Sequence, residues 1–426
     1  MHFPRTLTLL VLSGLVAIAG PDIAPFPSPP NIKGLQVQMV DDAVKLGIHH
    51  AAVNVNLTAL LDLSGNSAGP AHTAAGKTFR FNEVYLASLD ATIKPLSDQQ
   101  ILVYLILLAY PSNEPARDAV CLHPEASKDF KYSVGAFNTV TPDGRAYLQA
   151  VTEMLATRWS GAQPEHGRVW GWIVGNEMNS HYLWYNMGLQ TPETVIDAYA
   201  AAFRIVHTAV RKTSQNARLY LPLDHHWSVS MHGISKKEAI SGKFFLDTFA
   251  ARIRAGGDID WHFAGHPYPE DLGNPMVWAD KGITFDGATG KVTFKNLEVL
   301  TRHLEQPALH WQGKPRRVIL SEQGFHTLLT SEGEQLQAAA YAYAWEKCRR
   351  LPVVDAFIYH RHVDHAHEGG LRLGLWRNAP NSVSTPHSKK QIYDLFVKAG
   401  TPEWKAVAAF ALPVAGLNSW DELAPR

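Results

Sequence analysis

The chain has 426 residues, of which 46% are hydrophobic and 18% charged, a composition typical of a globular protein with a large core. Lys plus Arg and Asp plus Glu both number 39, so no excess charge favours nucleic acid or an anionic membrane surface as a partner. The length suits one large barrel domain or two ordinary domains.

The first 19 residues predict a secretion signal. Arg5 supplies the positive start, residues 7–18 are apolar, and Ala17-Ile18-Ala19 is a small-x-small cleavage site. A membrane anchor is the alternative, but this apolar run is shorter than the roughly 18–20 residues that span a bilayer. Residues 20–31 are rich in proline and predict an extended linker, followed by a single domain over residues 32–426. We therefore expect a secreted or periplasmic protein, and a monomer.

The body of the chain alternates between strand-like and helix-like segments. Apolar runs predict strands at residues 34–39, 51–57, 101–110, 168–175, 218–223, 259–264, 317–320 and 353–359. Helical spacing predicts helices at residues 40–47, 82–96, 141–159, 191–213, 243–255, 296–310, 333–351 and 389–410, with Asn82 and Thr141 as candidate N-caps. Eight such units predict a (β/α)₈ barrel with inserted loops.

Two smaller features complete the predicted layout. Residues 283–287 and 291–294 predict a small β-hairpin on the face of the barrel where the strands end. The two cysteines, Cys121 and Cys348, fall in a loop on that face and near the far end of a helix, so we expect both to be free thiols. An open doubly wound sheet is the competing fold, but no Gly-rich phosphate fingerprint follows the first strand.

Two buried strands end on carboxylates. Gly175-Asn176-Glu177 ends the fourth predicted strand, and Ser321-Glu322 ends the seventh. In a closed barrel these ends face each other across the mouth, where barrel enzymes place their catalytic groups. Glycosidic cleavage requires two such groups, one acid and one carboxylate. A gap of roughly 5 Å would make the second carboxylate a nucleophile with retention, and a wider gap would give inversion.

These two motifs resemble the clan GH-A glycoside hydrolases, which are retaining (β/α)₈-barrel enzymes. The resemblance implies that Glu177 is the acid/base, Glu322 the nucleophile and Asn176 the residue that holds the sugar 2-hydroxyl. His266-Pro267-Tyr268 ends strand six, where the clan often places a Tyr or His that touches the nucleophile. Many members carry Trp at the end of strand eight, whereas this chain has Ile358-Tyr359-His360, so the resemblance leaves the sugar open.

Other aromatic and polar residues near strand ends are candidates for substrate binding, because such rings stack on sugar faces. They are Tyr110 after strand three, His226 and Trp227 after strand five, His266 and Tyr268 after strand six, and His360, His362 and Trp376 after strand eight.

A metal site is the rival hypothesis. The region after strand eight holds His360, His362, His365, His367, Asp364 and Glu368, residue types that bind Zn²⁺. Barrel amidohydrolases, however, carry His-x-His at the end of strand one, where this chain has Gln36-Val37-Gln38. We predict a retaining glycoside hydrolase of oligo- or polysaccharides without metal or cofactor. The alternatives are a metal-dependent barrel hydrolase and a carbohydrate-binding barrel without turnover.

Overall fold

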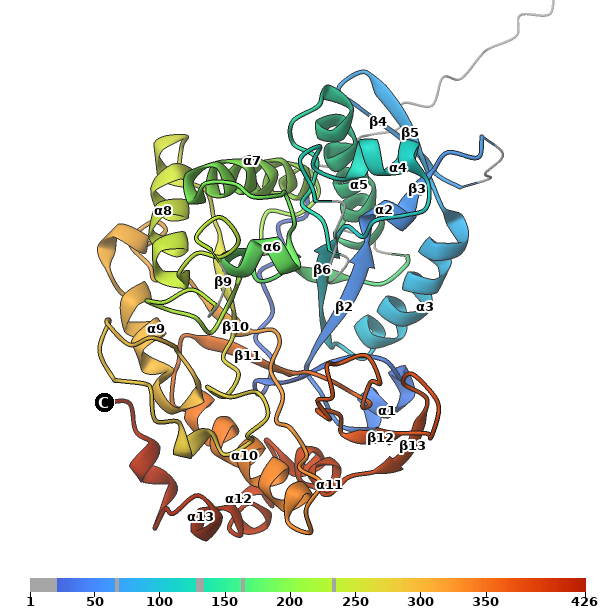
Figure 1. Cartoon of the computed structure of the whole chain (residues 1–426). Helices are drawn as coiled ribbons and strands as arrows, with labels where there is room; N and C mark the ends of the chain where they lie inside the picture. Colours follow the sequence, from blue (N-terminus) through green and yellow to red (C-terminus); the bar gives the residue numbers. More distant parts are fainter. Residues whose placement is uncertain (1–20, 66–68, 128–133, 162–164, 232–234) are drawn as a thin grey trace, which may run out of the picture.

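A closed parallel barrel forms the centre of the protein (Figure 1). The computed structural model describes residues 21–65, 69–127, 134–161, 165–231 and 235–426, so the predicted leader lies outside the described residues. The eight strands neighbour one another in the order β1-β2-β6-β7-β8-β9-β10-β11, and β11 pairs with β1 to close the ring. They are β1 (Lys33–Gln36), β2 (His50–Asn56), β6 (Leu102–Leu108), β7 (Val169–Val174), β8 (Arg218–Asp224), β9 (His262–His266), β10 (Val318–Leu320) and β11 (Val354–Tyr359). The predicted (β/α)₈ barrel is confirmed.

Each strand leads into a helix that covers the outside of the barrel. These helices are α1 (Val40–Lys45), α3 (Glu83–Asp98), α5 (Pro142–Trp159), α7 (Pro192–Arg211), α8 (Gly242–Ala255), α9 (Glu298–Leu304), α10 (Gly333–Cys348) and α11 (Gln391–Lys398). Two predicted N-caps are confirmed: the Asn82 side chain accepts from the Tyr85 amide at 3.1 Å, and that of Thr141 accepts from the Gly144 amide at 3.0 Å. These bonds satisfy amides that a helix leaves free in its first turn.

Aromatic contacts join the outer helices to one another. Tyr199 of α7 packs against Phe245 and Phe249 of α8, with ring centroids 5.8 and 5.5 Å apart, and the two helices lie side by side in Figure 1. Tyr341 of α10 packs against Phe396 of α11 at 5.2 Å. Such ring pairs contribute beyond their buried area, so they hold neighbouring helices to one another.

Shorter elements fill the connections. They are α2 (Leu57–Leu60), α4 (Pro115–Cys121), α6 (His181–Trp184), α12 (Trp404–Val407), α13 (Ala411–Val414), and the 3₁₀ turns η1 (Met178–Ser180), η2 (Val277–Ala279), η3 (Phe294–Asn296), η4 (Pro307–Leu309) and η5 (Trp420–Leu423). Cys121 and Cys348 are both free and buried, as predicted. Among the described residues, no helix has both the length and the apolar character needed to cross a membrane.

The hairpin predicted at residues 283–294 is wrong. No strand occurs there; instead Val292 donates its amide to the carbonyl of His225, and Lys291 forms an isolated bridge with His226. The Asn296 side chain donates to the carbonyls of Thr284 and Lys291, so a side chain satisfies the groups that a hairpin ladder would use. Small antiparallel sheets occur elsewhere, formed by β3 (Leu61–Asp62), β4 (Ala71–Ala74) and β5 (Lys77–Phe81), and by β12 (Trp376–Asn378) and β13 (Pro386–Lys389).

The proline-rich residues before β1 pack against the amino ends of the strands. The Arg218 guanidinium lies 3.8 Å from the centre of the Phe26 ring, and Phe26 meets the Trp170 ring edge-on at 5.7 Å. Asp22 forms a parallel bridge with Ser214. This segment therefore covers the end of the barrel opposite to the one where the strands finish.

Gly171 in β7 leaves room for a neighbouring ring in the barrel. A Cβ atom on Gly171 would lie 2.0 Å from Cδ1 of the fully buried Tyr104, whose hydroxyl is hydrogen-bonded to His50 Nδ1 at 3.0 Å. We expect Gly171→Ala to lower the free energy of unfolding by about 1–3 kcal/mol, because the packed ring must shift. Urea unfolding measures this loss. Gly287→Ala, whose added Cβ meets nothing within 4 Å, is the matched control, and equal midpoints for the two variants would contradict the expectation.

Candidate active site

Strand β7 delivers Glu177 to the mouth of the barrel through a sharp change of backbone direction. All six residues of β7 are buried, and Gly175 then adopts a φ of 87°. Glu177 itself has φ 40° and ψ 56°, the left-handed region that residues other than Gly rarely occupy. Strain of this kind is characteristic of functional sites, because the surrounding structure must hold the residue there. The Glu177 side chain ends up 8% exposed.

Strand β10 brings Glu322 opposite to Glu177. One carboxylate oxygen of each residue and one ring nitrogen of His266 all lie within 4.8 Å of one another. The Tyr268 hydroxyl donates to Glu322 Oε1 at 3.2 Å. Burial raises the pKa of Tyr268 well above its usual value, and the charge of Glu322 adds to this, so the hydroxyl keeps its proton and remains a donor.

His266 connects the two halves of the site. Its Nδ1 lies 2.9 Å from Glu177 Oε1, and its Nε2 lies 3.1 Å from the hydroxyl oxygen of Ser321. Burial alone would lower the pKa of His266, but the hydrogen bond to Glu177 and the negative charge of Glu322 outweigh it, and the pKa is raised. With both ring nitrogens engaged, the imidazole fixes the orientation of the Glu177 carboxyl.

The environment of Glu177 favours a protonated carboxyl. Burial raises its pKa to about 7, and the charges of Asp224 and Glu322 act in the same direction against the hydrogen bond from His266. Asp224 lies at the end of β8, where its carboxylate accepts from Asn179 Nδ2 at 2.6 Å and also from the Ser180 hydroxyl. A carboxyl that holds its proton near neutral pH is suited to act as a general acid.

The raised pKa of Glu177 predicts a pH-dependent effect on stability. In the unfolded chain this carboxyl ionises near 4.5, whereas in the folded protein it keeps its proton up to about 7, so folding becomes less favourable as pH rises between these values. At roughly 1.4 kcal/mol per pKa unit, the full cost is on the order of 3 kcal/mol. We expect Glu177→Gln to stabilise the fold more at pH 8 than at pH 5, measured by urea midpoints. A gain that is equal at both pH values would contradict this.

A cavity of about 550 Å³ opens beside Glu322. Four residues predicted to bind substrate line it: Tyr110, Asn176, His360 and His362. Asn176 is half-buried. Within the described part of the chain its side-chain amide neither accepts nor donates a hydrogen bond, so its oxygen and nitrogen are available to a ligand. His266 and Tyr268 do not line the cavity, but His266 contacts Glu177 and Tyr268 contacts Glu322.

The tryptophans predicted to stack on sugar lie outside this cavity, which corrects that expectation. Trp227 is 3% exposed and meets the His303 ring edge-on, with centroids 5.0 Å apart. Trp376 donates its indole N–H to Asp42 Oδ2 at 2.8 Å and packs against the Tyr393 ring at 5.5 Å. Both rings are used to anchor loops to the barrel.

His226 also lies away from the cavity lining. Its ring Nδ1 lies 3.0 Å from Asp224 Oδ1, and its backbone amide donates to the same oxygen at 2.7 Å. It therefore holds Asp224, which in turn raises the pKa of Glu177. Asp224 was missed by sequence reasoning, although its place at the end of a buried strand was an available signal.

Several other residues line the cavity without having been predicted as substrate contacts, among them Gln36, Arg361 and Glu368. Gln36 is the last residue of β1. Arg361 directly follows the predicted His360, to which it is joined by a cis peptide bond. The sequence suggests Glu368 only as a possible metal ligand.

The residues after strand eight do not converge on a common point. His362 Nε2 lies 2.9 Å from Asp42 Oδ2, and Asp364 Oδ1 accepts from Lys390 Nζ at 2.6 Å. His365 and His367 contact each other, with ring centroids 5.6 Å apart. In the part of the chain that the structure describes, the grouping with metal-ligand spacing is instead Glu177, His266 and Glu322.

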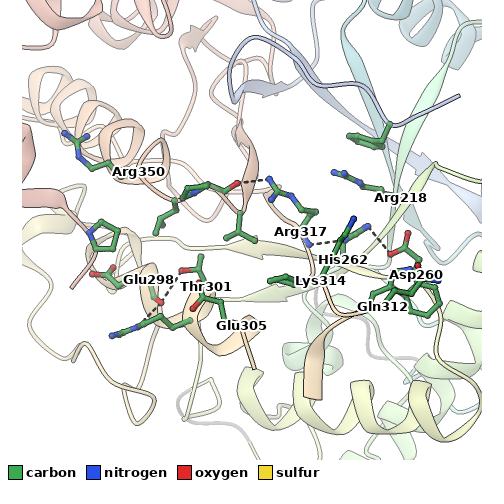
Figure 2. A pocket seen from close by; sticks show the side chains of 18 of the residues that line it. Arg218, Asp260, His262, Glu298, Thr301, Glu305, Gln312, Lys314, Arg317 and Arg350 are labelled. Carbon is green, nitrogen blue, oxygen red and sulfur yellow. Dashed lines mark hydrogen bonds and ion pairs between the residues drawn. The ribbon is translucent and has the colours of Figure 1, made fainter. Parts of the chain in front are cut away.

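A larger cavity, of about 800 Å³, lies at the amino ends of the strands (Figure 2). Arg218 begins β8, His262 begins β9, and Arg317 precedes β10. The two arginines share one partner, Asp355: Arg218 Nη1 lies 2.7 Å and Arg317 Nε 3.0 Å from its Oδ2. Because barrel enzymes place their catalysts at the carboxyl ends of the strands, we assign this cavity no part in the reaction.

Fold and site together define a (β/α)₈-barrel protein with two carboxylates facing each other at the carboxyl ends of its strands. The chain belongs to a family described as a family of unknown function (DUF5722), which it matches over residues 25–423. No curated protein matches it in sequence.

Solved structures share the barrel. A family 39 glycoside hydrolase from Bacteroides cellulosilyticus WH2 aligns with a TM-score of 0.54 and 13% identity over 90% of this chain, which spans only 66% of that protein. A β-glucosidase from Pyrococcus furiosus gives a TM-score of 0.57 and 13% identity, covering 88% of this chain and 86% of that one. For a β-xylosidase from Caulobacter crescentus CB15 the values are 0.50 and 14%, covering 89% and 68%. Sequence identities of 13–14% show that the fold is shared and nothing beyond it.

Proposed function

We propose that the protein is a secreted or periplasmic retaining glycoside hydrolase of the clan GH-A type. The observation that carries the proposal is the placement of Glu177 and Glu322 at the ends of β7 and β10, with carboxylate oxygens within 4.8 Å of each other. Retaining enzymes hold their two carboxyl groups roughly 5 Å apart, whereas inverting enzymes need roughly 6.5–9.5 Å to admit a water molecule. The glycosidase neighbours in the structural comparison support the same class.

The site residues take defined roles in this reaction. Glu322 attacks the anomeric carbon while Glu177 gives its proton to the leaving oxygen, so a covalent glycosyl–enzyme ester forms as the glycosidic bond breaks. Glu177 then takes a proton from water, which attacks the anomeric carbon and releases Glu322. Tyr268 holds the nucleophile through its hydroxyl. Asn176, in the cavity beside Glu322, is placed to contact the sugar.

A panel of 4-nitrophenyl glycosides tests this proposal. We expect hydrolysis of at least one member, with proton NMR showing that the first sugar released keeps the anomeric configuration of the substrate. A matched 2-deoxy-2-fluoro glycosyl fluoride should label Glu322, which peptide mass spectrometry would locate. Inversion of configuration, or a label on another residue, would contradict the retaining mechanism.

The same panel separates the two alternatives. A metal-dependent hydrolase would lose activity with EDTA and regain it with Zn²⁺, and the spacing of Glu177, His266 and Glu322 makes this test necessary. A carbohydrate-binding barrel without turnover would bind sugars in calorimetry while hydrolysing no glycoside. We expect activity that is insensitive to EDTA.

A further inference from the structure

One wall of the cavity beside Glu322 is a hydrogen-bonded row of polar side chains. Gln36 Nε2 donates to Asn54 Oδ1 at 3.0 Å, and Gln36 Oε1 is hydrogen-bonded to His360 Nδ1. The Glu368 carboxylate then lies 3.4 Å from His360 Nε2 and 2.5 Å from Arg361 Nη2. All five of these residues line the cavity. We call Asn54, Gln36, His360, Glu368 and Arg361 the polar row.

The barrel topology places most of this row on the nucleophile's side of the cavity. Gln36 ends β1, and His360, Arg361 and Glu368 follow β11; these two strands continue round the ring from β10, which Glu322 follows, whereas Asn54 lies on β2, between β1 and β6. The other side is formed by Tyr110, Val134 and Trp184, from the segments after β6 and β7, next to the strand of the proton donor. In a retaining enzyme the sugar that becomes attached lies against the nucleophile, and the leaving group lies against the acid. The polar row therefore faces the attached sugar.

Glu368 is the acidic member of the row, and Arg361 is its basic partner. Burial alone would raise the pKa of Glu368, but the hydrogen bond with His360 and the charges of His360 and Arg361 lower it to about 2. Arg361 is already paired with this carboxylate, so it offers little attraction to a second anion. With the charge of Glu322 in the same cavity, an acidic sugar would bring a further negative charge into a partly desolvated space, which is costly.

Glu368 retains the capacity to bind hydroxyl groups. An ionised carboxylate has about four acceptor positions on two oxygens, and His360 and Arg361 occupy one on each. Each oxygen thus keeps a free position for a donor. Two neighbouring hydroxyls of a sugar ring present such donors side by side.

We propose that the polar row is the subsite for the attached sugar and that it selects a neutral sugar over a uronic acid. Glu368 accepts hydrogen bonds from two adjacent ring hydroxyls, and Gln36 and Asn54 extend the contact along the ring. This inference rests on the proposed glycosidase function, since it uses Glu322 to decide which sugar lies against the row. It names a substrate class that the fold alone leaves open.

The test pairs each neutral 4-nitrophenyl glycoside with the uronide of the same ring configuration, using wild-type protein. We expect kcat/KM for the neutral member to exceed that for its uronide by about 100-fold or more, as expected when an extra buried charge lacks a partner. A uronide hydrolysed as fast as its neutral counterpart, or faster, would overturn the inference while leaving the glycosidase proposal intact.

A variant of Glu368 tests whether the polar row causes the preference for a neutral sugar over a uronide. Glu368→Gln should lower kcat/KM for the neutral substrate by about 10- to 100-fold, because the variant loses a charge-assisted hydrogen bond. It should also reduce the ratio of kcat/KM for the neutral glycoside to kcat/KM for its uronide. Asp98→Asn is the matched control, since it removes a carboxylate from the exposed Lys94–Asp98 ion pair on α3. An unchanged ratio in Glu368→Gln would overturn the role of Glu368.

If no glycoside is hydrolysed, the glycosidase proposal is contradicted. Binding measurements then test the polar row separately. Saturation-transfer NMR would then compare glucose, galactose, mannose and xylose with glucuronate and galacturonate, each on wild-type protein and on Glu368→Gln. Binding of a neutral sugar that weakens in the variant supports the row as a neutral-sugar site. Preferential binding of a uronate, or binding of none of these sugars, would overturn it.

Discussion

Replacing Glu322 with glutamine should lower kcat by roughly 10⁴-fold or more on any glycoside that the wild-type protein hydrolyses. The amide is nearly the same size as the carboxylate but cannot form the glycosyl ester, so the first step loses its nucleophile. Initial rates with a 4-nitrophenyl glycoside measure this loss. Circular dichroism and the urea midpoint establish that the variant is folded.

Two comparisons make this result specific. Glu332→Gln removes an exposed carboxylate from the same β10–α10 connection and should leave kcat unchanged. Glu322→Gly creates space for an added azide ion, which should restore turnover and yield a glycosyl azide of the opposite anomeric configuration. If Glu322→Gln kept the wild-type kcat, Glu322 would not be the nucleophile.

Replacing Glu177 with glutamine should produce a loss that depends on the leaving group. A general acid contributes roughly 10²–10⁴-fold, and it matters most when the departing oxygen needs a proton. We expect kcat/KM to fall by that range for a methyl glycoside and much less for the activated 2,4-dinitrophenyl glycoside of the same sugar. Equal losses on both substrates would contradict the role of Glu177 as proton donor.

The pH profile gives an independent readout of the same residue. Because the pKa of Glu177 is raised to about 7, its protonated form declines above that value, and wild-type kcat/KM should fall as pH rises through it. This alkaline limb should disappear in Glu177→Gln. Glu193→Gln, an exposed carboxylate in the first turn of α7, should keep the wild-type profile.

The polar groups behind the two glutamates are consistent with the different roles that we propose for them. Glu177 is buried, hydrogen-bonded to His266 and close to the charge of Asp224, so it is held as an acid. Glu322 is less buried, opens onto the cavity and accepts a hydrogen bond from Tyr268, which stabilises a carboxylate. Two carboxyl groups in different environments are the means by which glycosidases obtain an acid and a nucleophile at one pH.

The sequence by itself determined the eight barrel strands, the main helices between them and the positions of both glutamates at strand ends. Runs such as Val169–Val174 are apolar throughout because both faces of a barrel strand are covered, and this local pattern needs no knowledge of neighbours. Helix starts at Asn82 and Thr141 were equally local, since a cap bonds to amides two or three residues away.

Only the tertiary structure decided which side chains face the cavity. Trp227 and Tyr110 both follow buried strands, yet Trp227 packs under a loop against His303, whereas Tyr110 lines the cavity. The direction of such a side chain depends on loops that are distant in the sequence. The residues predicted as a hairpin similarly pair with the segment after β8, because Asn296 satisfies their backbone groups.

The polar row depends on the same long-range assembly. Gln36 and His360 are 324 positions apart in the chain and meet only because β11 closes the barrel on β1. The approach of Glu177 to Glu322 has the same origin, since it is set by the diameter of the ring and by the turn at Gly175. The candidate residues and the proposed reaction class could thus be inferred from local patterns, whereas the distance that favours retention and the residues that line the cavity arise from the closed barrel.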